Sequence, residues 1–203
     1  MEWTLPHTKP DSRGNRRYFT IASSPTEDKI HIGIKVPDQP SSFKSAFQIF
    51  PKESEVVASR LSGNFVLPKD HSQKVVGIAG GIGITPFRSM AKFLIDSREK
   101  RDMVIFYACL HPDEFAYKEI FDEAKSFGVR MQYVITDSKN VPPGWQGSIG
   151  FLNKQIISTA CPDFLERVFY LSGPDAMVNA YKKLLKGMGV SSTSIKVDYF
   201  PGY

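Results

Sequence analysis

The sequence predicts an α/β protein in two parts, a small antiparallel β part followed by a doubly wound parallel sheet with helices on both faces. Three observations lead to this prediction. Isoleucine and valine alternate with other residues over residues 30–36, which is typical of a half-buried antiparallel strand. From Lys74 onward, short apolar runs alternate with helical patterns, which indicates a parallel sheet. Residues 68–73 are polar and rich in turn-forming residues, so we place the boundary there, between domains of residues 1–70 and 71–203.

The elements expected in the first part are short strands. After an apolar run at residues 1–5, the chain is polar and rich in turns as far as residue 17. Runs of strand-forming residues then predict strands at residues 18–21, 30–36, 55–59 and 64–67.

The second part is expected to contain strands and helices in turn. Strands are predicted at residues 75–79, 103–109, 131–136, 168–171 and 195–197. Helices are predicted near residues 87–97, 113–127, 151–157 and 176–188. Gly128 and Gly189 follow two of these helices, where glycine commonly ends a helix.

A glycine-rich turn at residues 80–83 joins the first strand of the second part to its first helix. Thr85 is expected to cap this helix, and Pro86 suits its first position. Free backbone N–H groups at such a helix start attract a phosphate. Gly81 and Gly83 fit a G-x-G-x-x-G fingerprint, but Pro86 replaces the third glycine and no carboxylate follows residues 103–109. The turn alone therefore leaves a nucleotide site and a plain strand-to-helix turn equally open.

Composition and charge exclude several classes of protein. The 203 residues are 41% hydrophobic and 23% charged, as in a soluble globular protein, and no apolar run reaches membrane-span length. The start lacks signal-peptide features, so we expect a cytoplasmic protein or the cytoplasmic portion of a longer membrane-associated protein. Cys109 and Cys161 show no metal, redox or iron–sulfur spacing, so no metal site is expected. The net charge of +5 is spread along the chain without a nucleic-acid motif, which favours no nucleic-acid partner and at most a mild preference for an acidic one.

Five short motifs follow one another along the chain. They are Arg17-x-Phe19-Thr20-x-x-Ser23, Gly80-Gly81-Ile82-Gly83-Ile84-Thr85-Pro86, Phe106-Tyr107, Ser172-Gly173-Pro174-x-x-Met177 and Asp198-Tyr199-Phe200-Pro201-Gly202-Tyr203. Each resembles the motif at the same place in the ferredoxin–NADP reductase family. Because five ordered motifs are far more specific than one, the chain is identified as resembling this family over nearly its whole length.

The resemblance implies an antiparallel β-barrel that holds FAD and a parallel α/β domain that holds NADPH or NADH. It also implies transfer of a hydride from the nicotinamide to the flavin, and of electrons onward to a separate acceptor. That acceptor would be a ferredoxin, a flavodoxin, a haem protein or a membrane redox partner.

The resemblance assigns roles to residues of the first part. Arg17 would grip the flavin pyrophosphate with its planar guanidinium, and Thr20 would hydrogen-bond near the flavin atom that receives the hydride. Phe19, Ser23, Ser24 and Ser42 would supply further flavin contacts. The plainer alternatives are a surface arginine and a strand threonine.

The second part carries the remaining implied roles. Ser172 and Asp198 join Thr20 as catalytic candidates, Ser172 at the nicotinamide–flavin junction and Asp198 as a hydrogen-bonding or proton-relay group. The implied cofactor contacts are Gly81, Gly83, Thr85, Pro86, Gly173, Pro174 and Met177, with the aromatic rings of Phe200 and Tyr203 covering the flavin. Each of these residues also has a structural interpretation. The glycines would allow close packing, and Met177 would belong to the core. Asp198 would be a solvated strand end, and the rings of Phe200 and Tyr203 would pack on the barrel.

The coenzyme preference depends on the residues after the third parallel strand. Ser138 and Lys139 would bind the 2′-phosphate of NADPH, whereas Asp137 would repel it. Because of Lys139, we expect a slight preference for NADPH over NADH.

Departures from the family pattern bear on function. Phe19 replaces a tyrosine and Ser172 a cysteine, and only 16 residues precede Arg17, so the first barrel strands are expected to be absent. We therefore expect weakened retention of FAD. The alternative function is a truncated nucleotide-binding or interaction module that does not retain flavin and lacks redox activity alone. An ordinary dehydrogenase is disfavoured because no constellation of His, Lys or Tyr with a general-base role stands out.

Overall fold

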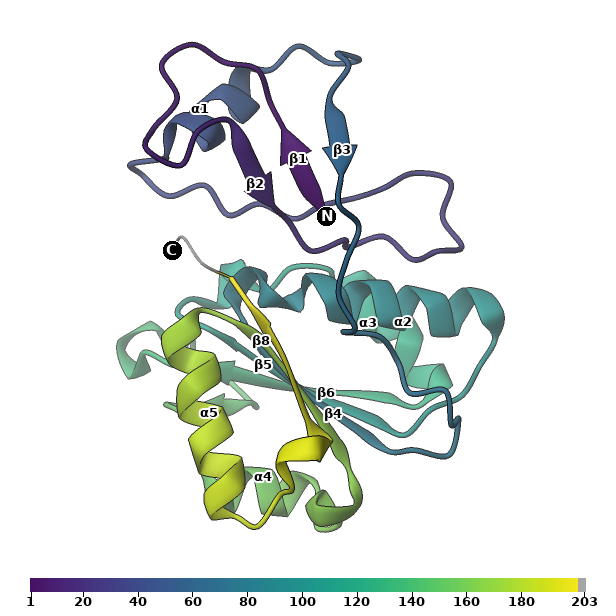
Figure 1. Ribbon diagram of the computed structural model, residues 1–203. Helices are drawn as coiled ribbons and strands as arrows, with labels where there is room; N and C mark the ends of the chain where they lie inside the picture. Colours follow the sequence, from purple (N-terminus) through teal and green to yellow (C-terminus); the bar gives the residue numbers. More distant parts are fainter. Residues whose placement is uncertain (201–203) are drawn as a thin grey trace.

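The computed structural model describes residues 1–200, which form two sheets that lie one above the other (Figure 1). The first sheet is antiparallel in the order β2-β1-β3, and α1 lies beside it. Its elements are β1 (Glu2–Thr4), β2 (Arg16–Tyr18), α1 (Ser42–Ile49) and β3 (Val57–Ser59). Within residues 1–200 the strands of this half form a three-stranded sheet. The strand predicted at residues 55–59 is confirmed as β3, the strand predicted at residues 18–21 lies instead at residues 16–18, and β1 and α1 were not predicted.

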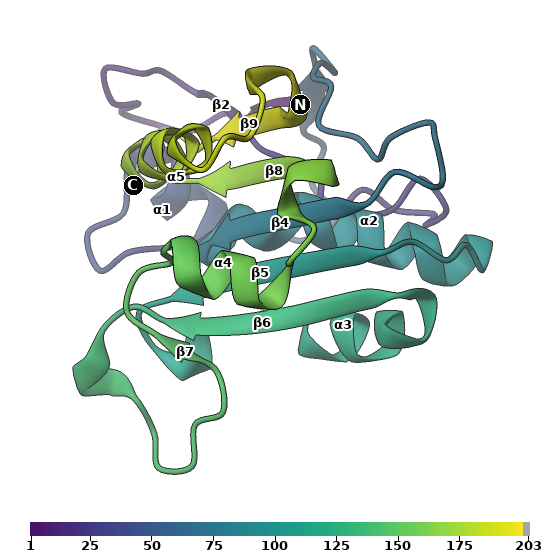
Figure 2. The same ribbon diagram turned by 90° about the horizontal axis from the view of Figure 1, so that it is seen from below.

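The second sheet has the order β7-β6-β5-β4-β8-β9, and all its strand pairs are parallel (Figure 2). Its strands are β4 (Val75–Gly80), β5 (Met103–Cys109), β6 (Val129–Ile135), β7 (Ser148–Ile149), β8 (Val168–Gly173) and β9 (Ile195–Tyr199). The five predicted strands are confirmed to within two residues at each end, and β7 was not predicted.

Helices cover both faces of this sheet, as the strand-helix alternation predicts (Figure 2). One face carries α2 (Thr85–Ser97) and α3 (Lys118–Ala124), and the other carries α4 (Lys154–Ala160) and α5 (Asp175–Gly187). The 3₁₀ turns are η1 (Gly81–Ile84), η2 (Pro112–Glu114), η3 (Lys125–Phe127), η4 (Ser138–Asn140), η5 (Phe164–Glu166) and η6 (Ser192–Ser194). The single helix predicted at residues 113–127 is wrong, because a loop separates η2 from α3.

Two predicted strands of the first part are also wrong. Residues 30–36 contribute a single bridge between Ile21 and Ile32. Here Gly33 packs against the side chain of Thr85, and an ion pair joins Lys35 to Glu114, so contacts with the second part replace strand pairing. Residues 64–67 form no strand, because the ring of Phe65 packs on Phe87 and Tyr170 in the second part.

The helix start after the glycine turn differs in detail from the prediction. The turn is a 3₁₀ helix, and α2 begins at Thr85 itself. The Thr85 hydroxyl donates to the carbonyl of Ile82 (3.1 Å), so Thr85 is not the capping residue, and Pro86 takes the second position of α2. None of the helices in residues 1–200 is long and apolar enough to cross a membrane.

Candidate functional site

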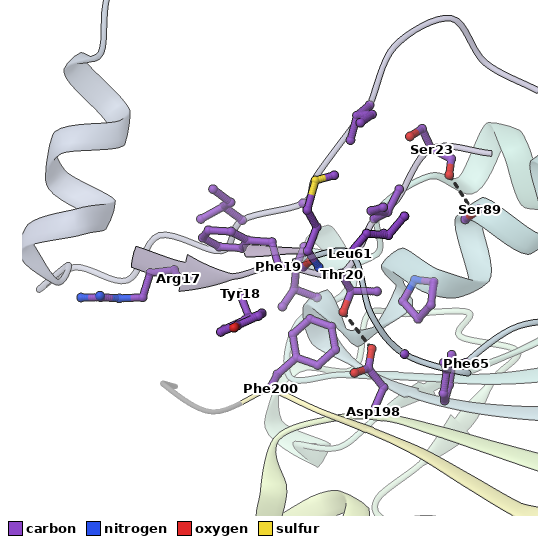
Figure 3. Close-up of a pocket in the computed structure, with 18 of the residues that line it drawn as sticks. Arg17, Tyr18, Phe19, Thr20, Ser23, Leu61, Phe65, Ser89, Asp198 and Phe200 are labelled. Carbon is purple, nitrogen blue, oxygen red and sulfur yellow. Dashed lines mark hydrogen bonds between the residues drawn. The ribbon is translucent and has the colours of Figure 1, made fainter. Parts of the chain in front are cut away.

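A cavity of about 1070 Å³ lies between the two parts of the chain (Figure 3). Eight of the predicted site residues line it: Arg17, Phe19, Thr20, Ser23, Ser24, Pro86, Asp198 and Phe200. Ligand pockets of roughly 300–1,000 Å³ hold drug-sized molecules, so this cavity has room for a large cofactor. Its lining combines aromatic rings, hydroxyl groups and basic side chains.

Thr20 and Asp198 meet in this cavity although they are far apart in the sequence. The Thr20 hydroxyl donates to the Asp198 carboxylate (2.8 Å), which joins the first part to the end of β9 (Figure 3). Burial raises the pKa of the Asp198 carboxyl above its ordinary value of 3.8, and the hydrogen bond from Thr20 opposes that shift. The cavity wall therefore contains a buried carboxyl group whose pKa is raised and which is hydrogen-bonded across the two parts.

Arg17 lies on β2, and its guanidinium is held within the first part. It donates to both carboxylate oxygens of Asp11 (2.7 and 2.8 Å) and to the carbonyl of Gly14 (2.9 Å), and it lies over the Phe43 ring. The side chain is only 12% exposed, so it is not the plain surface arginine of the alternative interpretation. In Figure 3 it points away from Asp198 and toward the α1 side of the cavity.

The other polar residues predicted in the first part already hold local structure. Ser23 accepts a hydrogen bond from the backbone of His31 (3.0 Å), and Ser24 bonds the hydroxyl of Thr26 (2.6 Å). Ser42, the first residue of α1, accepts from the backbone of Asp11 (2.9 Å) and is not among the described residues that line the cavity.

The glycine turn is shaped by backbone geometry and close packing. Gly81 has a left-handed backbone (φ +51°) that favours glycine. At Gly83, a Cβ atom would lie 2.2 Å from the Ser172 carbonyl oxygen, so close packing alone requires a glycine there. Neither these glycines nor Thr85 is among the described cavity-lining residues, whereas Ile82 is.

Ser172 lies at the carboxyl edge of the parallel sheet, where ligands of such sheets bind. Its backbone is paired with Ala79 on one side and Asp198 on the other. The side chain is fully buried, and its hydroxyl oxygen has no hydrogen-bond partner within residues 1–200. Ser172 is not among the described residues that line the cavity, so its hydroxyl is an unpaired polar atom in the interior at this edge of the sheet.

Gly173 ends β8, Pro174 caps α5, and Met177 lies in the first turn of α5. The Met177 side chain fills the space beside Gly80 and Gly173, where added Cβ atoms would lie 2.3 and 2.7 Å from its atoms. Met177 therefore packs on the turn and also belongs to the edge of the core.

Ser138 and Lys139 lie in η4, just beyond the carboxyl end of β6, and both are exposed. Asp137 accepts hydrogen bonds from the Lys139 backbone (3.0 Å) and from the Asn140 side chain (3.2 Å), which fixes this loop. Phe200 donates its backbone N–H to the Gly173 carbonyl (3.0 Å), which places its ring beside Asp198 (Figure 3). Tyr203 lies outside the described residues.

Sequence reasoning missed part of the cavity wall. Helix α2 contributes Ser89, Met90 and Phe93, and the segment before the second part contributes Leu61 and Phe65. The helical spacing marked Met90 as part of an apolar helix face, but no local signal distinguished its contribution to a cavity from core packing.

Comparisons with known proteins agree with this architecture. The family model of the oxidoreductase NAD-binding domain matches residues 78–183. The glycine betaine monooxygenase reductase subunit of Pseudomonas aeruginosa is 33% identical over 130 residues, which cover 64% of this chain and 36% of the relative. The stachydrine N-demethylase reductase subunit of Rhizobium meliloti is 24% identical over 193 residues, which cover 92% of this chain and 54% of the relative. The chain thus spans about half or less of the length of these curated relatives.

Solved structures share the fold of the whole chain. The Amycolatopsis cytochrome P450 reductase GcoB matches with a TM-score of 0.82 and 23% identity, over 98% of this chain and 59% of that one. The cytochrome b5 reductase domain of Ulva prolifera nitrate reductase matches with a TM-score of 0.82 and 18% identity, over 97% of this chain and 82% of that one. The expected two-domain α/β fold is therefore confirmed.

Proposed function

The chain belongs to the oxidoreductase NAD-binding domain family, and from that premise we propose that it is an NAD(P)H-dependent flavin reductase module serving a separate electron acceptor. The observation that carries the proposal is the cavity between the two parts, where Thr20 of one meets Asp198 of the other. In this proposal residues 1–70 bind FAD and residues 71–203 bind the nicotinamide coenzyme.

The residues present fit both cofactors. Aromatic rings at Phe19 and Phe200 line the cavity and suit a flat heterocycle. The Ser172 hydroxyl has no hydrogen-bond partner within residues 1–200, and a polar coenzyme group at the carboxyl edge of the sheet would supply one once the side chain is uncovered. When both are bound, the nicotinamide supplies a hydride and the flavin accepts it before passing electrons onward.

The chain's own residues bind, orient and handle protons. Thr20 and Asp198 would serve as a hydrogen-bonding and proton-relay pair beside the ring-binding part of the cavity, where burial raises the pKa of the Asp198 carboxyl. Thr85, Pro86 and the glycines before them would orient the coenzyme, together with Gly173, Pro174 and Met177. A flavin pyrophosphate would have to compete with the Asp11 carboxylate for the Arg17 guanidinium, which supports the expectation of weak FAD retention.

The acceptor is proposed from the printed names of relatives alone. The reductase subunits named above serve a monooxygenase and an N-demethylase, so an oxygenase component is the acceptor class we favour over a ferredoxin, flavodoxin, other haem protein or membrane partner. A cytoplasmic location is part of the proposal.

Reconstitution with FAD followed by titration with NADPH and NADH without air tests this function. We expect the added flavin to bind and its absorbance to be bleached by the coenzyme. A colourless chain that binds NADPH but never reduces added FAD would support the alternative, a nucleotide-binding module without redox activity.

A further inference from the structure

Arg88 and Glu27 form an ion pair between the two parts of the chain. Arg88 lies on α2, three residues after Thr85, and donates from both terminal nitrogens to the two carboxylate oxygens of Glu27, with the Nη2–Oε1 distance 2.9 Å. It also donates to the carbonyl of Ala22 (3.1 Å). The two side chains are only 10% and 16% exposed, so this is a two-pronged, largely desolvated pair rather than a loose surface contact.

The loop at residues 22–27 closes around this pair. Glu27 also accepts a hydrogen bond from the backbone N–H of Ser24 (2.7 Å), and the Ser89 hydroxyl donates to the Ser23 carbonyl (2.7 Å; Figure 3). Ser23, Ser24 and Glu27 line the cavity from the first part, and Ser89 lines it from α2, the helix that starts at the glycine turn and also carries Arg88. One small cluster therefore ties the wall of the proposed flavin cavity to the element that would orient the coenzyme.

Neighbouring side chains also hold the Arg88–Glu27 pair in place. The Thr26 hydroxyl donates to Asp96 (2.5 Å), and Asp96 is paired with Lys92 on the same helix. The Tyr117 ring lies beneath the Arg88 guanidinium, 5.9 Å from ring centre to Cζ. Because Arg88 is buried, removing Glu27 would leave its charge without a carboxylate partner, so loss of either side chain should loosen the contact between residues 22–27 and α2.

The geometry points to Arg88 and Glu27 as positioning residues, an interdomain latch that sets the distance between the two cofactor sites. This inference rests on the proposed function. Hydride donor and acceptor react only within about 3–3.5 Å, and a displacement of about 1 Å can cost about 100-fold in rate. Glu27 borders the proposed flavin cavity, but neither Arg88 nor Glu27 is among the residues proposed to hold the coenzyme, so loss of the latch should change the rate of transfer and not the affinity for the coenzyme.

Hydrogen exchange in the cofactor-free chain tests the latch without any activity. We expect amides of residues 22–27 to exchange about tenfold faster in Glu27→Gln and in Arg88→Met, because the loop opens locally. The matched control is Arg167→Met, which breaks a similarly buried arginine with two ion pairs that lies wholly within the second part. Equal loosening of residues 22–27 in that control, or none in the latch variants, would overturn the latch.

Rapid mixing of the FAD-reconstituted chain with NADPH or NADH tests the positioning role. At saturating coenzyme, flavin reduction should slow by about 10-fold to 100-fold in Glu27→Gln and Arg88→Met, while coenzyme affinity stays within about twofold. The double variant should be no slower than the worse single variant, and Arg88→Lys should recover part of the rate.

The outcomes separate this inference from the proposed function. If hydrogen exchange is faster in the variants but the rate of flavin reduction is unchanged, the latch exists but its positioning role is overturned. Failure of the unaltered chain to reduce flavin would overturn the proposed function and the positioning role with it, whereas the exchange experiment would still decide whether the latch exists.

Discussion

The two parts of the chain are stabilised in different ways. Strands β4, β5 and β8 are buried on both faces between helices, and their apolar side chains form two continuous core clusters. The strands of the first part have three residues each, and Tyr18 and Val57 are 58% and 63% exposed. The parallel sheet therefore carries its own core, whereas the first part depends on contacts with α2 and, in our proposal, on a bound flavin.

The largest expected effect is a loss of folding stability that is confined to one of the two parts. Phe169→Ala in β8 removes a fully buried ring and should lower the free energy of unfolding of the second part by about 3–5 kcal/mol. Phe43→Ala in α1 also removes a buried ring, but its contacts are His7, Phe19 and Arg17, so the loss should fall on the first part.

Tryptophan fluorescence in urea separates the two parts, because Trp3 lies in β1 and Trp145 lies before β7. We expect Phe43→Ala to shift the Trp3 transition, read in a Trp145→Phe background, and to leave the Trp145 transition, read in a Trp3→Phe background, unchanged. A single joint transition, shifted equally by both alanine variants, would show that the two parts unfold as one unit.

The parallel-sheet part was predictable from local patterns because its strands and helices carry their own signals. Buried β-branched runs mark β4 and β5, and helical spacing marks α2 and α5. In the first part, residues 30–36 have the alternation of a strand but pack against Thr85 and Glu114, and periodicity carries no information about such a partner.

The candidate site was predictable only through the ordered motifs. Thr20 and Asp198 are 178 residues apart, and no local pattern links them. The Arg17–Asp11 pair and the Arg88–Glu27 latch depend on which loops meet, which spacing does not encode.

The next prediction compares alanine substitutions at two glycines of the glycine turn, Gly83 and Gly81. Gly83→Ala would drive a Cβ atom against the Ser172 backbone and should lower the free energy of unfolding by about 1–3 kcal/mol, with weaker NADPH binding. Gly81→Ala meets open space and strains only its left-handed backbone, for about 1 kcal/mol. Urea unfolding and coenzyme titration measure both, and equal losses in the two variants would refute the close-packing account.

A smaller effect concerns the contact between Thr20 and Asp198. Because the Thr20 hydroxyl stabilises the ionised carboxylate, Thr20→Val should raise the pKa of Asp198 further and lower stability at neutral pH by about 1 kcal/mol. The folded chain already binds this proton more tightly than the unfolded chain, so stability falls as the pH rises from 3.8 through the raised pKa. Carboxyl-carbon NMR titration follows the group, with Thr20→Ser as the control. A pKa that moves down in Thr20→Val would contradict the assignment.

The smallest effect concerns coenzyme choice. Lys139 is exposed, so Lys139→Gln should weaken NADPH binding by only about 0.2–1 kcal/mol and leave NADH binding unchanged. Calorimetric titration with both coenzymes compares them, and Lys125→Gln on η3 is the control. Equal affinities for NADH and NADPH in the unaltered chain would contradict the expected preference for NADPH.

The absorbance of flavin added to the 203-residue chain, followed under NADPH and then NADH without air, tests the central claim most directly. We expect FAD to associate with the cavity between the two parts and to be reduced by at least one coenzyme. Flavin that stays oxidised while coenzyme binds, or FAD that never associates even at saturating concentration, would contradict it.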